Sequence, residues 1–287
     1  MPSFKHILFP IDFSPQTCGI APHVACMARR SGARVTMLHV AEMPAAAYPG
    51  FPLEAMAINF QEVLQDRQDR VNSFLRTEFE NVSATRLMIE GDPAWAIADF
   101  AEKERVDLIM MPTHGYGPFR RFILGSVTAK VLHDVKCPVW TSAHVPEAPA
   151  EPAGYRNLLC AVDLTPKSLP LLRWSCGFAR ELGATLKLVH AVPAEVRLGV
   201  DLEGEDWRAF LFDMAREEIA KLQQEAGTRF EVILAGGNVE KVVRGVAEES
   251  HADLVVIGRG VMQEKLGRMR THVYSVIREA PCPVMSV

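Results

Sequence analysis

Two stretches of this sequence contain residue types that could bind a phosphorylated ligand. In the first, PIDFS at residues 10–14, the carboxylate of Asp12 ends an otherwise apolar run. In the second, nine residues separate Gly115 from Gly125, and Ser126 follows. Glycines let backbone N–H groups approach phosphate oxygens without a Cβ in the way, and the N-terminus of a helix attracts an anion. The chemistry indicated is hydrogen bonding to a sugar or base by the first stretch and to phosphates by the second.

Each of these residues also has a structural interpretation. Asp12 could accept hydrogen bonds from ribose hydroxyls or an adenine amine, or it could join Ser14 in capping the next helix. Spacing alone does not decide between the two. The backbone around His39 could meet a purine edge, whereas the imidazoles of His39 and His190, at equivalent places in the chain, are more typical of buried, hydrogen-bonded histidines than of catalysts.

The glycine-containing loop is expected to lead into a helix over Val127–Asp134, opened by Gly125 and Ser126. Arg120 and Arg121, in the loop itself, could reach phosphate oxygens. Two glycines and a serine are a weak pattern by themselves, because any helix can be opened in this way.

The residues are positioned by a sequence that occurs twice. Four blocks recur in the same order: residues 4–17 match 155–168, 31–40 match 182–191, 91–112 match 237–258, and 125–139 match 270–284. The spacing between blocks locates two deletions in the second copy, one of them a single residue just before Gly260. A Pro- and Ala-rich stretch without periodicity separates the copies. We therefore expect domains at 1–143 and 155–287, joined by a linker at 144–154.

Each copy reads as five short strands alternating with four helices. The strands of the first copy are continuous apolar runs, HILFPI, RVTMLHV, TRLMIE, DLIMMP and CPVWTS, as expected for a parallel sheet covered on both faces. Asp92 followed by Pro93 is typical of a helix start. The predicted fold class is therefore α/β: two tandem Rossmann-like domains, each a five-stranded parallel sheet flanked by helices. Such sheets open a ligand crevice beyond the carboxyl ends of their strands, where the strand order reverses.

Composition excludes several classes of function. The chain has 31 Lys and Arg residues against 35 Asp and Glu residues, a net charge of −4, which argues against binding to nucleic acid or a membrane surface. No apolar run approaches the roughly 18 residues of a membrane span, and the N-terminus shows no cationic leader with a cleavage site. We therefore expect a cytoplasmic protein with neither nucleic-acid nor membrane partners.

Signatures of several enzyme classes are absent from the sequence: it contains no GxxxxGK[ST], GxSxG or HExxH motif and no kinase signature set. His133 and Cys137 could share a helix face and bind a metal, but no further ligands cluster nearby, so a helix end leading into a strand is favoured. We expect a binding protein without a metal site rather than an enzyme; slow ATP hydrolysis remains the open alternative.

The order of these segments resembles the universal stress protein family in its tandem form, over nearly the whole chain and once per copy. ILFPIDFS is similar to the opening strand of the family, and Gly115-x9-Gly125-Ser126 to the end of its nucleotide motif, Gly-x2-Gly-x9-Gly-(Ser/Thr). The resemblance implies the adenine nucleotide alpha hydrolase-like version of the Rossmann fold. It also implies an adenine nucleotide ligand (ATP, ADP or AMP, with or without Mg²⁺). The implied binding residues are Pro10, Asp12, Val40, Gly115, Gly125, Ser126 and Val127, of which the last four hold phosphates.

Both copies depart from the motif. In the first copy the first glycine of the motif is Pro112, which has no N–H to donate to a phosphate. In the second copy Arg270 and Thr271 replace Gly125 and Ser126, and the loop is one residue shorter. A degenerate second site kept as scaffold is favoured; alternatively, Arg259, Lys265, Arg268 and Arg270 could bind a different anion.

Three hypotheses about function follow. The first is a regulatory stress-response protein that binds ATP in the first copy, with the copies packed as an intramolecular pseudo-dimer through the strands around Val139 and Val284, and with a further homodimer possible in principle. The second is a nucleotide-independent scaffold or partner-binding protein. The third uses the apolar stretch 43–64 as a lid or cavity for an apolar ligand; packing of that stretch on the other copy is the favoured alternative.

Overall fold

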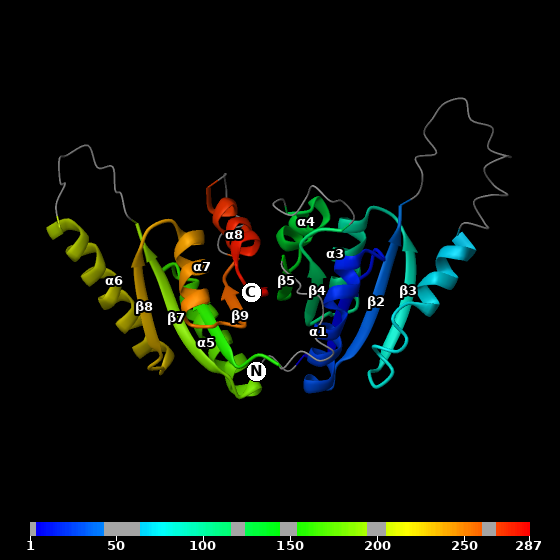
Figure 1. Cartoon of the computed structure of the whole chain (residues 1–287), viewed down its shortest axis with the longest axis horizontal. Helices are drawn as coiled ribbons and strands as arrows, with labels where there is room; N and C mark the ends of the chain where they lie inside the picture. The colour runs from blue at the N-terminus through cyan, green and yellow to red at the C-terminus, as the bar shows by residue number, and fades with distance from the viewer. Residues whose placement is uncertain (1–3, 43–63, 116–123, 144–153, 194–204, 260–267) are drawn as a thin grey trace, which may run out of the picture.

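A single ten-stranded sheet spans both copies in the computed structural model (Figure 1). The structure describes residues 4–42, 64–115, 124–143, 154–193, 205–259 and 268–287. Stretch 43–63, Arg120 and Arg121 lie outside these residues, as do Lys265 and the side chains of residues 268–271.

The elements of the first copy follow the predicted order. They are β1 (His6–Pro10), α1 (Pro15–Ser31), β2 (Arg34–Ala41), a helix at residues 64–73, β3 (Ala84–Glu90), α3 (Pro93–Lys103), β4 (Leu108–Pro112), α4 (Ser126–Asp134) and β5 (Val139–Ser142). The second copy repeats them. Its elements are β6 (Asn157–Ala161), α5 (Ser168–Leu182), β7 (Thr185–Val192), α6 (Glu205–Ala226), β8 (Glu231–Gly236), α7 (Val239–Glu249), β9 (Leu254–Ile257), α8 (Arg268–Glu279) and β10 (Val284–Ser286).

The strand order is β3-β2-β1-β4-β5-β10-β9-β6-β7-β8. Pairing is parallel within each half, and the order reverses between β1 and β4 and, equivalently, between β6 and β9. The halves join through antiparallel pairing of β5 with β10, in which Ser286 lies opposite Val139 and Val284 opposite Thr141. The predicted α/β class with two Rossmann-like domains is confirmed, and their five-stranded parallel halves join into one sheet.

Helix starts follow the local sequence. Asp92 caps α3 by accepting a hydrogen bond from the Trp95 N–H at 2.8 Å, and Pro93 occupies the first turn, as predicted. Ser14 caps α1 in the same way through the Thr17 N–H. These caps fix where each helix leaves the carboxyl end of the preceding strand, which is the edge where the ligand crevice is expected.

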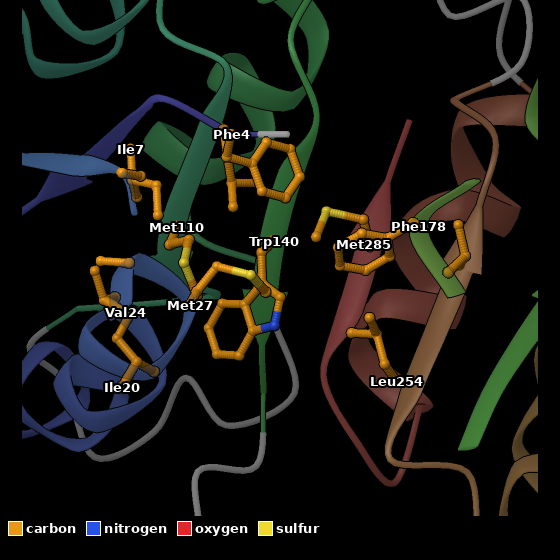
Figure 2. Close-up of a cluster of buried hydrophobic side chains, with 14 of the residues drawn as sticks. Phe4, Ile7, Ile20, Val24, Met27, Met110, Trp140, Phe178, Leu254 and Met285 are labelled. Carbon is orange, nitrogen blue, oxygen red and sulfur yellow. The ribbon is translucent and has the colours of Figure 1, made fainter. Parts of the chain in front are cut away.

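Two layers of apolar side chains cover the sheet. Helices α1, α5 and α6 pack on one face, and α3, α4, α7 and α8 on the other. Each layer runs without interruption through both copies; Figure 2 shows Trp140 of β5 with Met27 of α1 on one side and Met285 of β10 on the other. The indole Nε1 of the fully buried Trp140 donates to the Tyr155 hydroxyl at 2.7 Å. The two copies therefore share a core and a sheet.

Among the described residues, no helix combines the length and the apolar character that a bilayer span requires.

The half-buried imidazole of His23 packs against this shared core, with its ring centroid 5.4 Å from that of Trp140. Burial lowers the pKa of His23 below its ordinary value of 6.5. As pH falls through 6.5, the unfolded chain therefore takes up a proton before the folded protein does. The stability that neutral His23 confers is present above that pH and is lost below it.

We expect the free energy of unfolding to fall between pH 7 and pH 5, and to fall less steeply in His23→Phe. The two slopes should differ by at most the slope that the uptake of one proton produces. Urea unfolding at several pH values measures both slopes, with the exposed His251→Asn as control. Burial also lowers the pKa of His6 and His39, so His23→Phe should remove only part of the slope. Identical pH dependence in His23→Phe and the wild type would contradict the assignment.

Candidate functional site

A cavity of about 940 Å³ opens at the point where the strand order of the first copy reverses. It is bounded by the carboxyl ends of β1, β2 and β4 and by the N-terminus of α4. The seven residues named from the sequence all line it: Pro10, Asp12, Val40, Gly115, Gly125, Ser126 and Val127. Segments more than 100 residues apart in the sequence thus meet in one cavity.

Asp12 is the acidic residue at the end of β1, and its two carboxylate oxygens have different surroundings. Oδ1 accepts hydrogen bonds from the Ser14 N–H (2.9 Å), the Ser14 hydroxyl (2.6 Å) and the Thr17 hydroxyl (2.5 Å). Oδ2 lies against Gly115, and the side chain is exposed at the cavity. The capping interpretation is therefore confirmed for one oxygen, while the other faces the cavity.

The residue after Asp12 has a left-handed backbone. Phe13 has φ 63°, and Leu164, at the same place in the second copy, has φ 58°. This conformation costs about 1–3 kcal/mol for a residue with a side chain, so it persists because the packing around it fixes it. The Phe13 ring packs on His39, with 4.7 Å between centroids, and the Arg70 guanidinium lies 4.2 Å above it.

The two histidines at equivalent places both support the backbone of the neighbouring strand end. The Nδ1 atoms of His39 and His190 lie 2.9 Å and 2.8 Å from the carbonyl oxygens of Ile11 and Val162. Burial is the main cause that lowers the pKa of His39, which favours the neutral ring. The expectation of hydrogen-bonded histidines is confirmed, although both residues are half-buried rather than buried.

The other end of the cavity is formed by the first turn of α4. Gly125 is its N-cap, and no side chain among the described residues caps this helix. The Gly125 N–H donates to the Thr113 carbonyl at 2.8 Å, and a Cβ at Gly125 would lie 3.1 Å from that oxygen. The Thr128 hydroxyl donates to the Pro112 carbonyl at 3.1 Å, which holds the first turn against the end of β4. The turn is thus fixed at the cavity with its N–H groups available to an anion.

Pro112 ends β4 and lines the same cavity. The N–H of the next residue, Thr113, donates to the Ser142 carbonyl on β5 at 3.2 Å. Because successive N–H groups of a strand point to opposite edges, the nitrogen of residue 112 faces the β1 side, where the crevice opens. A proline there removes a donor from the crevice.

Sequence reasoning missed several residues that line the cavity: Glu42, Arg67, Arg70, Pro93, Ile97, Met111 and Thr128. Arg67 and Arg70 are three apart, the spacing of neighbours on one helix face. That spacing gives no indication of which cavity the face meets, which depends on how helix 64–73 packs on the sheet. Arg120 and Arg121, proposed from the sequence as phosphate contacts, lie outside the described residues.

The equivalent cavity of the second copy has a volume of only about 140 Å³. Asp163 retains the capping role there, since its Oδ1 accepts hydrogen bonds from the hydroxyls of Thr165 and Ser168, both at 2.8 Å. One hypothesis placed Arg259 in an anion site of the second copy. Its guanidinium instead donates to backbone carbonyls at the end of α4 in the first copy. That part of the alternative for the second copy is wrong.

Among the described residues, no group of three or more His, Cys, Asp or Glu side chains could hold a metal ion. The His133 Nδ1 instead lies 2.6 Å from the Asp134 carboxylate. α4 ends at Asp134 and β5 begins at Val139, so Cys137 lies between a helix end and a strand, as the favoured interpretation had it.

Gly115 has no room for a side chain, because a Cβ there would overlap the Asp12 carboxylate. We expect Gly115→Ala to displace Asp12 and to weaken, by roughly tenfold, the adenine-nucleotide binding that the sequence resemblance implies, which is the loss of about one charge-assisted hydrogen bond. Isothermal titration with ATP measures the change. Gly245→Ala is the control, since a Cβ on that helical glycine meets nothing within 4 Å; equal affinity of Gly115→Ala and the wild type would contradict the arrangement.

Two Rossmann-like halves in one chain, with a large cavity at the switch point of the first, define a tandem α/β protein of the doubly wound class. The family model described as "Universal stress protein family" matches residues 3–142 and again 154–287. The chain therefore belongs to the universal stress protein family and contains two of its domains.

Relatives among known proteins agree with this assignment. A universal stress protein of Methanocaldococcus jannaschii is 31% identical over 138 residues, which are 47% of this chain and 80% of that protein. One of Thermus aquaticus is 33% identical over 139 residues, 47% of this chain and 96% of that protein. The crystal structure of a universal stress protein from Archaeoglobus fulgidus matches 99% of this chain and 96% of its own, with a TM-score of 0.62 and 22% identity, which shows the shared fold.

Proposed function

We propose that this universal stress protein binds an adenine nucleotide (ATP, ADP or AMP) in the cavity of its first domain and acts as a regulatory protein in the stress response. The observation that supports this most is the meeting of Asp12 and the open N-terminus of α4 in a single 940 Å³ cavity. Hydroxyl or amine groups of the ligand pair with a carboxylate, and phosphates with helix N–H groups.

The proposal assigns the two ends of the cavity to two parts of the ligand. Adenine and ribose lie against Pro10, Asp12 and Val40, and the phosphates lie against Gly115, Gly125, Ser126 and Val127. The close approach of Gly125 to the Thr113 carbonyl supports this, because the lack of a Cβ lets the first turn of α4 lie against the end of β4, at the cavity. Mg²⁺, where it takes part, enters with the phosphates.

The proposal places one nucleotide on each chain. The second cavity has about one seventh of the volume of the first, and the motif residue Arg259 is engaged elsewhere. We expect the second domain to serve as a scaffold for the first.

A binding role fits the cavity better than catalysis. The Oδ1 of Asp12 already accepts three hydrogen bonds, its Oδ2 is the atom proposed to pair with the ribose or adenine, and the buried His114 has its Nδ1 3.0 Å from the Thr113 hydroxyl. Neither is arranged as a free general base for an attacking water. We propose that any ATP hydrolysis is slow compared with nucleotide exchange.

The direct test is to purify the protein without added nucleotide, denature it and analyse the supernatant by chromatography for adenine nucleotides. Calorimetric titration with ATP, ADP and AMP, with and without Mg²⁺, then ranks the ligands. Absence of binding at millimolar concentrations of all three would contradict the proposal and favour a nucleotide-independent scaffold.

Pro112 gives a prediction of the opposite sign. Replacing it with glycine restores an N–H on the β1 side of β4, where the crevice opens. We expect Pro112→Gly to bind ATP more tightly, by roughly tenfold for one hydrogen bond to a charged oxygen, at some cost in stability from the freer glycine.

Calorimetry with ATP and adenosine measures this difference. Pro112→Ala, which also restores the N–H, should show the same gain. Unchanged ATP affinity in both variants would contradict the view that residue 112 faces the phosphates.

A further inference from the structure

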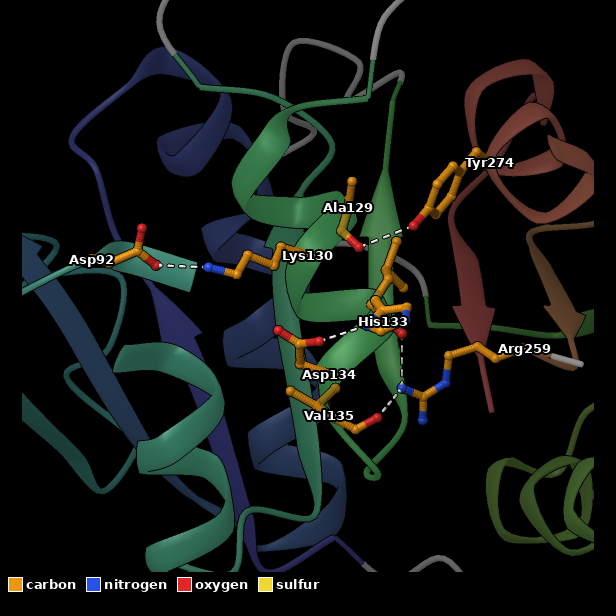
Figure 3. A network of polar contacts seen from close by, with 9 residues as sticks. Asp92, Ala129, Lys130, His133, Asp134, Val135, Arg259 and Tyr274 are labelled. Atoms are coloured by element: carbon orange, nitrogen blue, oxygen red, sulfur yellow. Dashed lines mark hydrogen bonds and ion pairs between the residues drawn. The ribbon is translucent and has the colours of Figure 1, made fainter. Parts of the chain in front are cut away.

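The second domain contacts α4, the helix whose N-terminus forms one end of the nucleotide cavity in the first domain. Arg259 follows β9, and its guanidinium donates to the carbonyls of Val135 (2.6 Å), Lys136 (3.0 Å) and Cys137 (2.7 Å). These carbonyls belong to the residues that follow α4 directly, and the same guanidinium also donates to the carbonyl of Leu132, in the last turn of α4, at 3.4 Å, where helix carbonyls lack intrahelical partners. Figure 3 shows Arg259 reaching from the second domain to this end of α4.

A second hydrogen bond from the second domain contacts the same helix nearer its start. The Tyr274 hydroxyl, from α8 of the second domain, donates to the Ala129 carbonyl at 3.1 Å (Figure 3). The antiparallel pairing of β5 with β10 fixes the distance between the two domains beside these contacts. α4 is therefore held by its own domain at the first turn, at Lys130 and through its buried side chains, and by the other domain at the Ala129 carbonyl and at its C-terminal end.

α4 is short enough for its two ends to move together. Its nine residues correspond to about 13 Å of helix at 1.5 Å per residue. Within its own domain, the first turn is held by the Thr128 hydroxyl on the Pro112 carbonyl and by the Gly125 N–H on the Thr113 carbonyl. A shift of the end held by Arg259 would thus be transmitted to the amides that face the cavity. A cation at the C-terminal end also stabilises the helix dipole.

We propose that Arg259 of the second domain is a positioning residue for phosphate binding in the first domain. It acts through α4 and makes no contact with the ligand. This inference rests on the proposed nucleotide binding, and it gives the second domain, whose own motif is degenerate, a defined role in the affinity of the first.

The proposal predicts a selective loss. Adenosine, which has no phosphates, depends on the Asp12 end of the cavity, whereas ATP depends on α4 as well. Arg259→Ala should therefore lower ATP affinity by about tenfold and leave adenosine affinity unchanged. The ATP affinity of Arg259→Lys should lie between those of Arg259→Ala and the wild type, because its single ammonium reaches fewer carbonyls. A general loosening of the fold would lower both affinities together.

Arg30 offers a matched control. Its guanidinium also crosses between domains and donates to the carbonyl of Leu182, the last residue of α5, at 2.8 Å. Arg30→Ala removes an arginine from a helix end at the same domain boundary without touching α4. Its affinities for ATP and adenosine should both equal those of the wild type.

Hydrogen exchange of the ligand-free protein provides a readout that does not depend on nucleotide. The amides of α4 should exchange faster in Arg259→Ala than in Arg30→Ala or the wild type. An unchanged ratio of ATP to adenosine affinity in Arg259→Ala, or unchanged exchange in α4, would overturn the inference while leaving nucleotide binding intact. Absence of ATP binding by the wild type would overturn the proposed function itself and this inference with it.

Discussion

Replacing Gly125 with arginine is expected to abolish ATP binding, with a loss of at least 100-fold, or about 2.7 kcal/mol. A Cβ at this N-cap already lies 3.1 Å from the Thr113 carbonyl, and a longer side chain must extend over the first turn of α4. The substitution copies Arg270, which occupies the equivalent place in the second domain. Calorimetric titration of the purified variant with ATP measures the effect.

Asn238→Arg is the matched control for this experiment. Asn238 is the exposed N-cap of α7 in the second domain and, like Gly125, makes no side-chain capping bond. The same large side chain at that helix start should leave ATP affinity unchanged. Retention of wild-type affinity by Gly125→Arg would contradict the proposed phosphate site.

Replacing Asp12 with alanine should produce the second large effect. The variant loses the Oδ2 that faces the cavity, so we expect the affinities for ATP and for adenosine to fall by roughly 10- to 100-fold, as for one or two hydrogen bonds to a charged group. It also loses the Oδ1 hydrogen bonds that support the start of α1, at a cost of about 1 kcal/mol in stability.

The repeat supplies the control. Asp163 makes the same kind of capping contacts at the start of α5, with Thr165 and Ser168. Asp163→Ala should therefore lose a similar amount of stability in urea unfolding and none of the affinity. Parallel loss of stability and affinity in both variants, or loss of stability in both without loss of affinity, would show that the carboxylate of Asp12 serves only as a cap.

The fold could be predicted from the sequence because local and long-range signals agree. Continuous apolar runs such as those at β1 and β4 occur where a strand is covered on both faces, and the observed strands are fully buried. The repeat supports each assignment a second time, because Asp92 and Asn238 begin equivalent helices in the two copies. The ten strands form one sheet because β5 pairs with β10. These are the strands around Val139 and Val284, through which the two copies were expected to pack.

The site was predictable only where a motif marks it. The glycine loop and Asp12 follow strands whose carboxyl ends must share an edge of a parallel sheet, so their meeting follows from the topology. Arg67 and Arg70 reach the cavity from a helix whose packing the sequence pattern does not specify. Spacing also could not show that the Asp12 carboxylate would both cap α1 and line the cavity. Nor could it show that Arg259 would donate hydrogen bonds to the other domain.

Calorimetric titration of the full-length wild-type protein with ATP tests the central claim most directly. The account predicts saturable binding below millimolar concentration with one nucleotide per chain, absent in Gly125→Arg and retained in Asp163→Ala. No binding at millimolar ATP, or two nucleotides per chain with one remaining after Gly125→Arg, would contradict it.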